Sequence, residues 1–183
     1  MVLTATKSPF RFKKNELKEL LKNMVVVIDS REKKYNHIVK YLDRKQVNYR
    51  VNKLDFGDYT AELPAIEQLG VNRPLHFNDS IAIERKANLE ELSQNCTQRR
   101  EQFENELRRA GSAKLILMVE DKNGYENILR HKYETELNPK AYLATLQTYR
   151  HRYQLEIVFI DPKLSGNFVY YTLYYFLREY FKC

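Results

Sequence analysis

The sequence predicts an α/β protein with one mixed β-sheet flanked by helices, and three observations support this fold class. Short apolar runs of strand length, such as Val25–Ile28 and Lys114–Val119, alternate with longer stretches of helical periodicity. The chain has 183 residues, of which 43% are hydrophobic and 30% charged, an ordinary balance for a globular protein. Only Cys96 and Cys183 are cysteines, and a core of this size needs no disulfide framework.

The N-terminal segment is expected to be a loose arm over residues 1–12, followed by a short helix over Glu16–Lys22 that Asn15 would cap. No linker or internal repeat interrupts the rest of the chain. We therefore divide it into an N-terminal arm with a short helix (residues 1–23) and one main domain (residues 24–183).

The first half of the main domain is expected to contain two strands and one helix. Val25–Ile28 is apolar on both faces, which predicts a central buried strand that ends at Asp29. Lysines surround the apolar residues of Tyr35–Gln46, a pattern typical of an amphipathic helix. Tyr49–Leu54 alternates like a strand at the sheet margin, whereas Thr60–Asp79 contains two prolines and a glycine and is expected to be a loop with at most a small hairpin.

The second half of the main domain has a more regular pattern. Ile81–Lys86 reads IAIERK, an apolar, β-branched strand that becomes charged at its end. Leu89–Ala110 is dense in charge and is expected to be one long helix that Gly111 ends. The remaining expected elements are a strand over Lys114–Val119, a helix over Pro139–Tyr153, a strand over Leu155–Ile160 and a final helix over Gly166–Phe181.

The charge of the chain bears on its partners. The formal net charge is +7 and the pI about 9.3, which favours a polyanionic partner such as nucleic acid, although solvated lysines give the same count. No apolar run is long enough to span a bilayer, and basic residues interrupt any signal-peptide pattern. We therefore expect an intracellular protein, cytoplasmic and nucleoid-associated or nuclear, with no membrane partner. The four histidines show no ligand spacing.

Acidic residues follow three segments that could meet at one edge of the sheet. Successive strand residues point to opposite faces, so Glu84 and Lys86 share a face and Arg85 points the other way. Asp29 follows the first predicted strand, and Asp58 follows a glycine turn. Carboxylates suit Mg²⁺, which activates water and neutralises phosphate charge, and a nearby ammonium positions that water. Taken singly, each feature is also typical of a turn residue, a helix cap or a solvated strand end.

Together, the segments VVVIDSRE, LDFGDY and IAIERK resemble the nuclease domain of the XPF and Hef family of structure-specific endonucleases, over roughly Val25–Phe181. That family carries an apolar strand ending in Asp-x-Arg-Glu, then Gly-Asp-Tyr, then Glu-Arg-Lys. The resemblance implies a restriction-endonuclease-like fold, with a central mixed β-sheet flanked by helices. It also implies Mg²⁺- or Mn²⁺-dependent cutting of branched, forked or flapped DNA.

The resemblance also implies roles for individual residues. The family's metal ligands fall on Asp29, Asp58 and Glu84, its catalytic lysine falls on Lys86, and Arg31, Glu32 and Arg85 lie in or beside the active site. Three features depart from the family pattern. The family's basic helix has an Arg followed by a Gln, and Gln98, Arg99, Arg100 and Gln102 offer this pair without fixing its register. Glu90 stands where the family usually has an Asp, and no tandem helix-hairpin-helix module follows, so DNA would be gripped without one or with a partner's.

Two further regions have more than one interpretation. Arg99 and Arg100 follow the active-site strand and are expected to contact DNA, although their mixing with glutamates also fits a solvated helix face. The aromatic segment Gly166–Phe181 is apolar on nearly all sides, which favours a homodimer interface; core packing and base stacking are the alternatives. The resembling family pairs nuclease domains through this region.

These features predict a metal-dependent DNA endonuclease that acts in repair, recombination or mobile-element processing. The first alternative is a non-catalytic DNA-binding or scaffold module of the same fold, which should have lost acidic residues at the metal positions. The second is another nuclease of the wider superfamily, such as a restriction enzyme. Its sequence-reading domain would find little room in 183 residues.

Overall fold

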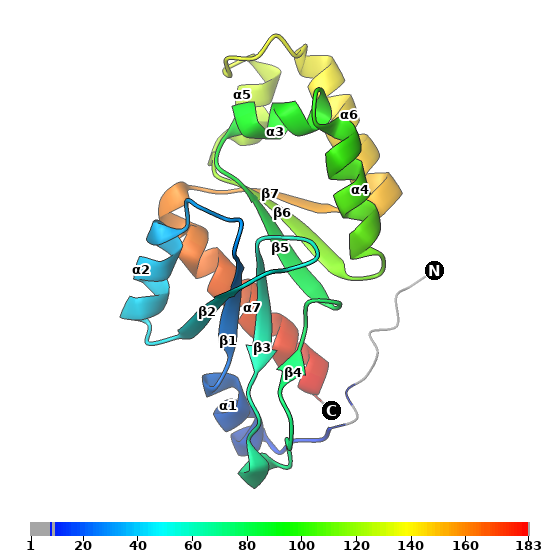
Figure 1. The fold of residues 1–183 in the computed structure, drawn as a ribbon. Helices are drawn as coiled ribbons and strands as arrows, with labels where there is room; N and C mark the ends of the chain where they lie inside the picture. The colour runs from blue at the N-terminus through cyan, green and yellow to red at the C-terminus, as the bar shows by residue number, and fades with distance from the viewer. Residues whose placement is uncertain (1–7, 9, 183) are drawn as a thin grey trace.

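The structure, a computed structural model, describes residues 8 and 10–182, and the predicted arm lies mostly outside this part (Figure 1). The strands are β1 (Val25–Asp29), β2 (Asn48–Asn52), β3 (Tyr59–Leu63), β4 (Leu75–His76), β5 (Ile81–Lys86), β6 (Lys114–Val119) and β7 (Glu156–Phe159). The α-helices are α1 (Lys14–Lys22), α2 (Asn36–Arg44), α3 (Leu89–Cys96), α4 (Arg100–Ala110), α5 (Gly124–Leu129), α6 (Pro139–Tyr153) and α7 (Ser165–Phe181).

These strands form one mixed sheet in the order β2-β1-β3-β5-β6-β7, with β4 paired to β3. Strands β1 and β2 are parallel, as are β5, β6 and β7. Strand β3 runs antiparallel to β1, β4 and β5 and so joins the two parallel halves. The predicted α/β class, with a central mixed sheet flanked by helices, is therefore confirmed.

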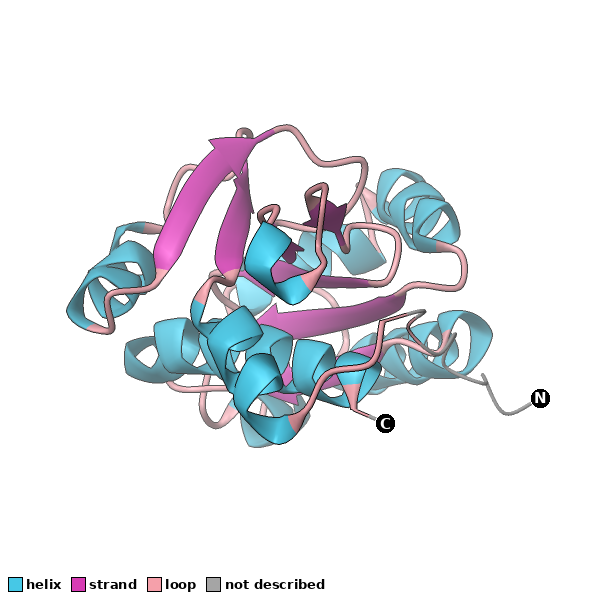
Figure 2. Ribbon diagram, turned by 90° about the horizontal axis from the view of Figure 1, so that it is seen from below, coloured by secondary structure: helices cyan, strands magenta, loops and turns pink. Residues whose placement is uncertain are grey.

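The two faces of the sheet are covered differently. On one face, α1, α2 and α7 pack over β1, β3, β5 and β6, with Ile28, Ile83 and Met118 in their shared core. On the other face, α3, α4 and α6 form a second core with Leu117 and Val119 of β6. Figure 2 shows helices on both sides of the strands. Because side chains alternate along a strand, residues two apart on β5 or β6 enter the same core.

Three elements differ from the sequence prediction. The segment predicted as a loop with at most a small hairpin does contain a hairpin, β3 with β4, but β3 also pairs with β1 and β5 and all five of its residues are buried. The sequence gives little sign of this central strand, because Pro64 ends the run early. The predicted helix over Leu89–Ala110 is instead two helices. The chain turns at Thr97, whose hydroxyl donates to the Ser93 carbonyl at 2.9 Å and competes with the helical pattern. Helix α5 has six residues, too few to show a period.

Helix α7 belongs mainly to the core. Leu173 and Leu177 are fully buried, and the helix packs against α1 and α2. Much of its apolar surface is therefore explained by packing within one chain, one of the alternatives to a dimer interface that the sequence left open. Helix α1 shares this core, and the domain boundary at residue 24 stays a prediction. Among the residues described, no helix has both the length and the apolar character needed to cross a membrane.

Candidate active site

The end of β5 and the turn before β3 meet at one edge of the sheet. Tyr59 pairs with Ile83, and both enter the core beneath α7, so the neighbouring Asp58 and Glu84 point to the opposite face. The N–H of Asp58 donates to the Ile83 carbonyl at 2.8 Å, and the N–H of Asp29 donates to the Asp58 carbonyl at 2.8 Å. The backbone thus fixes the turn against both neighbouring strands.

Two hydrogen bonds orient the carboxylates at this edge. The backbone N–H of Arg85 donates to Asp58 Oδ2 at 2.8 Å, and Lys86 Nζ donates to Glu84 Oε1 at 2.6 Å. Glu84 and Lys86 are both buried, with exposed fractions of 5% and 7%. The structure therefore brings Asp58, Glu84 and Lys86 together on one face of the sheet.

These side chains line a pocket of about 170 Å³ whose other wall is formed by α3 and α4. Arg31, Arg99 and Glu106 also line it. Glu106 was missed by sequence reasoning; its Oε1 accepts a hydrogen bond from the Gly57 N–H at 3.2 Å. Its position in a helix of mixed charge gave no sign that it faces the site.

Asp58 and Glu84 lie close together in the pocket, in surroundings that disfavour the charged form of each carboxylate. Burial raises the pKa of Asp58 to about 7, although the hydrogen bond from the Arg85 N–H opposes this. Burial, followed by the charge of Asp58, raises the pKa of Glu84 well above its ordinary value. Burial alone would lower the pKa of Lys86, but the charge of Glu84 and the hydrogen bond to it raise it overall. Lys86 therefore keeps its proton, and a further cation would stabilise both carboxylates.

The donor set can be compared with what a hard divalent cation requires. Among the described residues, no three acidic, histidine or cysteine side chains converge closely enough to form a complete metal site. Asp58 and Glu84 still fit Mg²⁺, because this ion is commonly bound through one or two carboxylates and keeps several waters. Their raised pKa values support the fit, since a cation favours the charged forms that burial disfavours.

Asp29 is engaged differently from the other two predicted metal ligands. Its Oδ1 accepts hydrogen bonds from the Arg31 backbone at 2.7 Å and from Arg31 Nε at 2.8 Å. Its Oδ2 accepts from Arg31 Nη2 at 2.9 Å and from the Leu54 N–H at 2.7 Å. Burial alone would raise the pKa of Asp29, but these bonds lower it overall. Asp29 thus anchors the segment that leads to Asp58, and its role as a metal ligand stays a prediction.

Arg85 and Glu32 lie on the far side of β5 from Glu84 and Lys86. Arg85 Nη2 donates to Glu120 Oε2 at 2.5 Å, and Arg85 Nη1 is 3.6 Å from Glu32 Oε2. His37 Nε2 lies 2.5 Å from Glu120 Oε1. Burial alone would raise the pKa of Glu120, but the hydrogen bond from Arg85 helps to lower it overall. This buried ion network supports the strand whose backbone holds Asp58.

Comparison with known proteins now identifies the family. A family profile, the ERCC4 domain, matches residues 28–172, which is most of the chain. The chain belongs to the ERCC4 domain family. Among curated proteins no match was found.

Two solved structures share the fold of this ERCC4 domain. One is XPF from Aeropyrum pernix, with a TM-score of 0.58 and 19% identity over 81% of this chain and 63% of that chain. The other is XPF from Aeropyrum pernix in complex with DNA, with a TM-score of 0.58 and 18% identity over 85% of this chain and 65% of that one. This chain therefore spans somewhat less than two thirds of each, and the likeness confirms the predicted restriction-endonuclease-like fold.

Of three other residues predicted for the site of this ERCC4 domain, one lines the pocket and two do not. Arg99 lines it, at the turn before α4. Arg100 instead pairs with Glu104 at 3.0 Å, one helical turn along α4. Glu90 accepts a hydrogen bond from the Glu134 N–H at 3.2 Å and is not among the pocket residues. The geometry thus favours Arg99 over Arg100 for a contact with a molecule in the pocket.

The turn that positions Asp58 in this ERCC4 domain requires a glycine at position 57. Its φ is 69°, and an added Cβ would lie 2.7 Å from the Ala82 Cβ. We expect Gly57→Ala to destabilise the fold by about 2–4 kcal/mol, from backbone strain plus overlap. Gly70→Ala is the matched control, since its φ is 72° but nothing lies within 4 Å of the added Cβ. Urea denaturation of both variants measures the difference, and equal losses would show that the contact with Ala82 is unimportant.

Proposed function

We propose that this chain is a divalent-metal-dependent DNA endonuclease that cuts branched, forked or flapped DNA. The observation that carries the proposal is the meeting of Asp58, Glu84 and Lys86 in one pocket, with Arg99 beside them. Family membership and the fold shared with XPF support a nuclease. A non-catalytic scaffold of the same fold is disfavoured, because it would have no need to keep these charged groups together in one pocket.

Each side chain has a separate role in the proposed reaction. Asp58 and Glu84 would hold Mg²⁺ or Mn²⁺, which supplies an activated water and screens phosphate charge when bound. Lys86 keeps its proton because it is paired with Glu84, so it would donate a hydrogen bond to the attacking water or a phosphate oxygen. Arg99 would contact the phosphodiester from the α4 side of the pocket. Such an activity fits repair, recombination or mobile-element processing in the nucleoid or nucleus.

A panel of labelled substrates tests this proposal. We expect Mg²⁺-dependent cleavage of flap, fork or Holliday-junction DNA near the branch, slower cleavage of linear duplex, and no cleavage in EDTA. DNA binding should weaken steeply with salt and vary little with base sequence, because phosphate contacts lead. If no substrate is cut with either Mg²⁺ or Mn²⁺, while DNA still binds, the scaffold alternative is correct.

A homodimer through the outer face of α7 is the second part of the proposal. Tyr175 is 48% exposed, its ring stacks on Tyr171 at 5.9 Å, and Arg178 lies 5.6 Å from its centre. Such exposed aromatic and arginine groups are typical of interface centres. We expect Tyr171→Glu/Tyr175→Glu to sediment as a monomer, whereas Tyr125→Glu, exposed on α5, should not change the mass. A wild-type monomer at micromolar concentration would contradict the dimer.

A further inference from the structure

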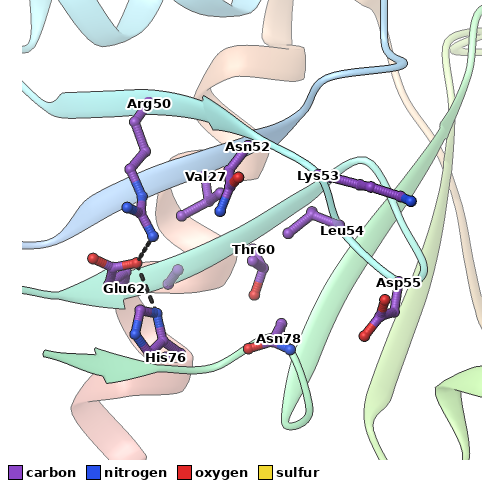
Figure 3. Close-up of a pocket in the computed structure, with 11 residues that line it drawn as sticks. Val27, Arg50, Asn52, Lys53, Leu54, Asp55, Thr60, Glu62, His76 and Asn78 are labelled. Atoms are coloured by element: carbon purple, nitrogen blue, oxygen red, sulfur yellow. Dashed lines mark hydrogen bonds and ion pairs between the residues drawn. The ribbon is translucent and has the colours of Figure 1, made fainter.

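One part of the sheet beside the candidate active site is not packed against a helix on this side, although its strand residues Val27, Thr60 and Glu62 are themselves buried. The helices α3, α4 and α6 form a core with β5, β6 and the chain around β7. This core contains no residue of β1, β2 or β3. On that same side, the described chain leaves a polar pocket of about 130 Å³ over β1, β2 and β3, bordered by β4 (Figure 3). We call this area the open sheet face.

Strand register fixes which side chains belong to the open sheet face. Val27 is paired with Arg50 on β2 and with Thr60 on β3, and Glu62 is paired with His76 on β4. All of them line the pocket. The alternate residues of β1 and β3, by contrast, enter the core beneath α7.

The same alternation connects the open sheet face to the candidate active site. Thr60 is two residues from Asp58, so both project to the same side of the sheet. Strand residues rise about 3.3 Å each, so Thr60 and Glu62 lie roughly 7 and 13 Å from Asp58 along β3. The segment 53–58 contributes to both pockets, because Lys53 and Asp55 line one and Gly57 and Asp58 line the other. A strand held at Asp58 therefore reaches the open sheet face within a short distance.

The lining offers hydrogen bonds rather than apolar contact. Asn52 and Asn78 approach the pocket from opposite sides, from β2 and from the turn after β4 (Figure 3). Glu62 pairs directly with Arg50, and His76 Nδ1 lies 2.8 Å from the same carboxylate. Amides that donate and accept suit the edge of an unpaired base, and the neighbouring Lys53 suits its phosphate. The volume holds roughly four waters, which admits one small planar group and not a duplex.

We propose that the open sheet face binds an unpaired nucleotide of the DNA strand that leaves the active site. This inference rests on the proposed nuclease function and deepens it, because it assigns part of the preference for partly single-stranded substrates to Asn52 and Asn78. The charge of the whole chain, +7, favours the same class of partner.

Anisotropy titration in EDTA tests this binding without cleavage. The probes are a blunt duplex and the same duplex with a short unpaired 5′ or 3′ tail. We expect the wild type to bind one tailed duplex about tenfold more tightly than the blunt one, and Asn52→Ala/Asn78→Ala to bring this ratio close to one. The matched control is Asn15→Ala/Asn72→Ala, which removes two exposed amides outside the pocket and should keep the wild-type ratio.

The outcomes separate this inference from the proposed function. An unchanged ratio in Asn52→Ala/Asn78→Ala, or a wild type that does not distinguish tailed from blunt DNA, overturns the open sheet face as a binding site while cleavage can still occur. A wild type that neither binds nor cuts any DNA overturns the proposed function itself. Thermal melting checks the fold of the double variant, and the single variant Asn52→Ala, exposed on an edge strand, replaces it if folding is lost.

Discussion

Replacing Asp58 with Asn should slow cleavage of a flap substrate by roughly a hundredfold or more, with DNA binding in EDTA retained. Asn has nearly the same shape and can still accept the hydrogen bond that the Arg85 N–H donates to Asp58 Oδ2 at 2.8 Å. It removes, however, a charge from the proposed cation site, and amides are weaker ligands for Mg²⁺ than carboxylates. Cleavage rates are compared under single-turnover conditions.

The control for this variant is Asp43→Asn, which changes an exposed carboxylate on α2 and should cleave like the wild type. Lys86→Ala should also lose most activity, but through the loss of a hydrogen-bond donor in the pocket and not through loss of the cation. A wild-type rate in Asp58→Asn would show that Asp58 is not part of the catalytic site and that the Gly57 turn is only structural.

The same substitution should alter stability in a pH-dependent way. Burial raises the pKa of Asp58 to about 7 in the folded protein, from an ordinary value of 3.8. A carboxyl whose pKa is raised on folding stabilises the fold fully at a pH below its ordinary pKa, and this stabilisation is lost as the pH rises through the folded-state pKa of about 7. Without metal, the free energy of unfolding of the wild type should therefore fall by about 1–2 kcal/mol between mildly acidic and mildly basic pH, whereas that of Asp58→Asn should not. The expected loss is modest because Asp58 is partly in contact with solvent. Thermal melts in EDTA measure this, and parallel pH profiles would contradict it.

The largest effect on stability is expected for Glu120→Ala. Arg85 is 6% exposed and keeps its charge, so removal of Glu120 leaves a buried guanidinium whose nearest other carboxylate oxygen, on Glu32, is 3.6 Å away. Breaking one side of a buried ion pair typically destabilises a protein by about 3–5 kcal/mol. Urea denaturation measures the loss. Because β5 carries both Arg85 and Glu84, cleavage should fall as well.

The control for Glu120→Ala is Glu126→Ala, which breaks an exposed pair with Arg130 at 2.9 Å and should change stability by less than about 1 kcal/mol. The double variant Arg85→Met/Glu120→Leu should be more stable than Glu120→Ala, since no buried charge is left unpaired. If Glu120→Ala and Glu126→Ala lose similar stability, the network does not support β5 in the way described.

Parts of this site could be predicted from the sequence because they depend on spacing alone. The period of two along IAIERK places Glu84 and Lys86 on one face, and the structure agrees. Asp58 was found through its motif, but its contact with β5 depends on β3, which the prediction treated as loop. Pro64 concealed that strand, which is stabilised by its pairing with β1, β4 and β5.

Other parts of the site depend on contacts that no local pattern reveals. Glu106 faces the pocket because α4 starts after a break at Thr97, and a continuous helix would have aimed it elsewhere. Glu120 meets Arg85 only because β5 and β6 are parallel neighbours. The pairing of Asp29 with Arg31 could have been predicted from the sequence, because an Asp side chain commonly accepts a hydrogen bond from the backbone N–H two residues later in a turn.

Calorimetric titration with Mn²⁺ in the absence of DNA tests the central claim, that Asp58 and Glu84 hold the cation that cleavage requires. We expect the wild type to bind Mn²⁺, Asp58→Asn and Glu84→Gln to bind it at least tenfold more weakly, and Lys86→Ala to bind it nearly as the wild type does. Equal Mn²⁺ affinity in the wild type, Asp58→Asn and Glu84→Gln would contradict it.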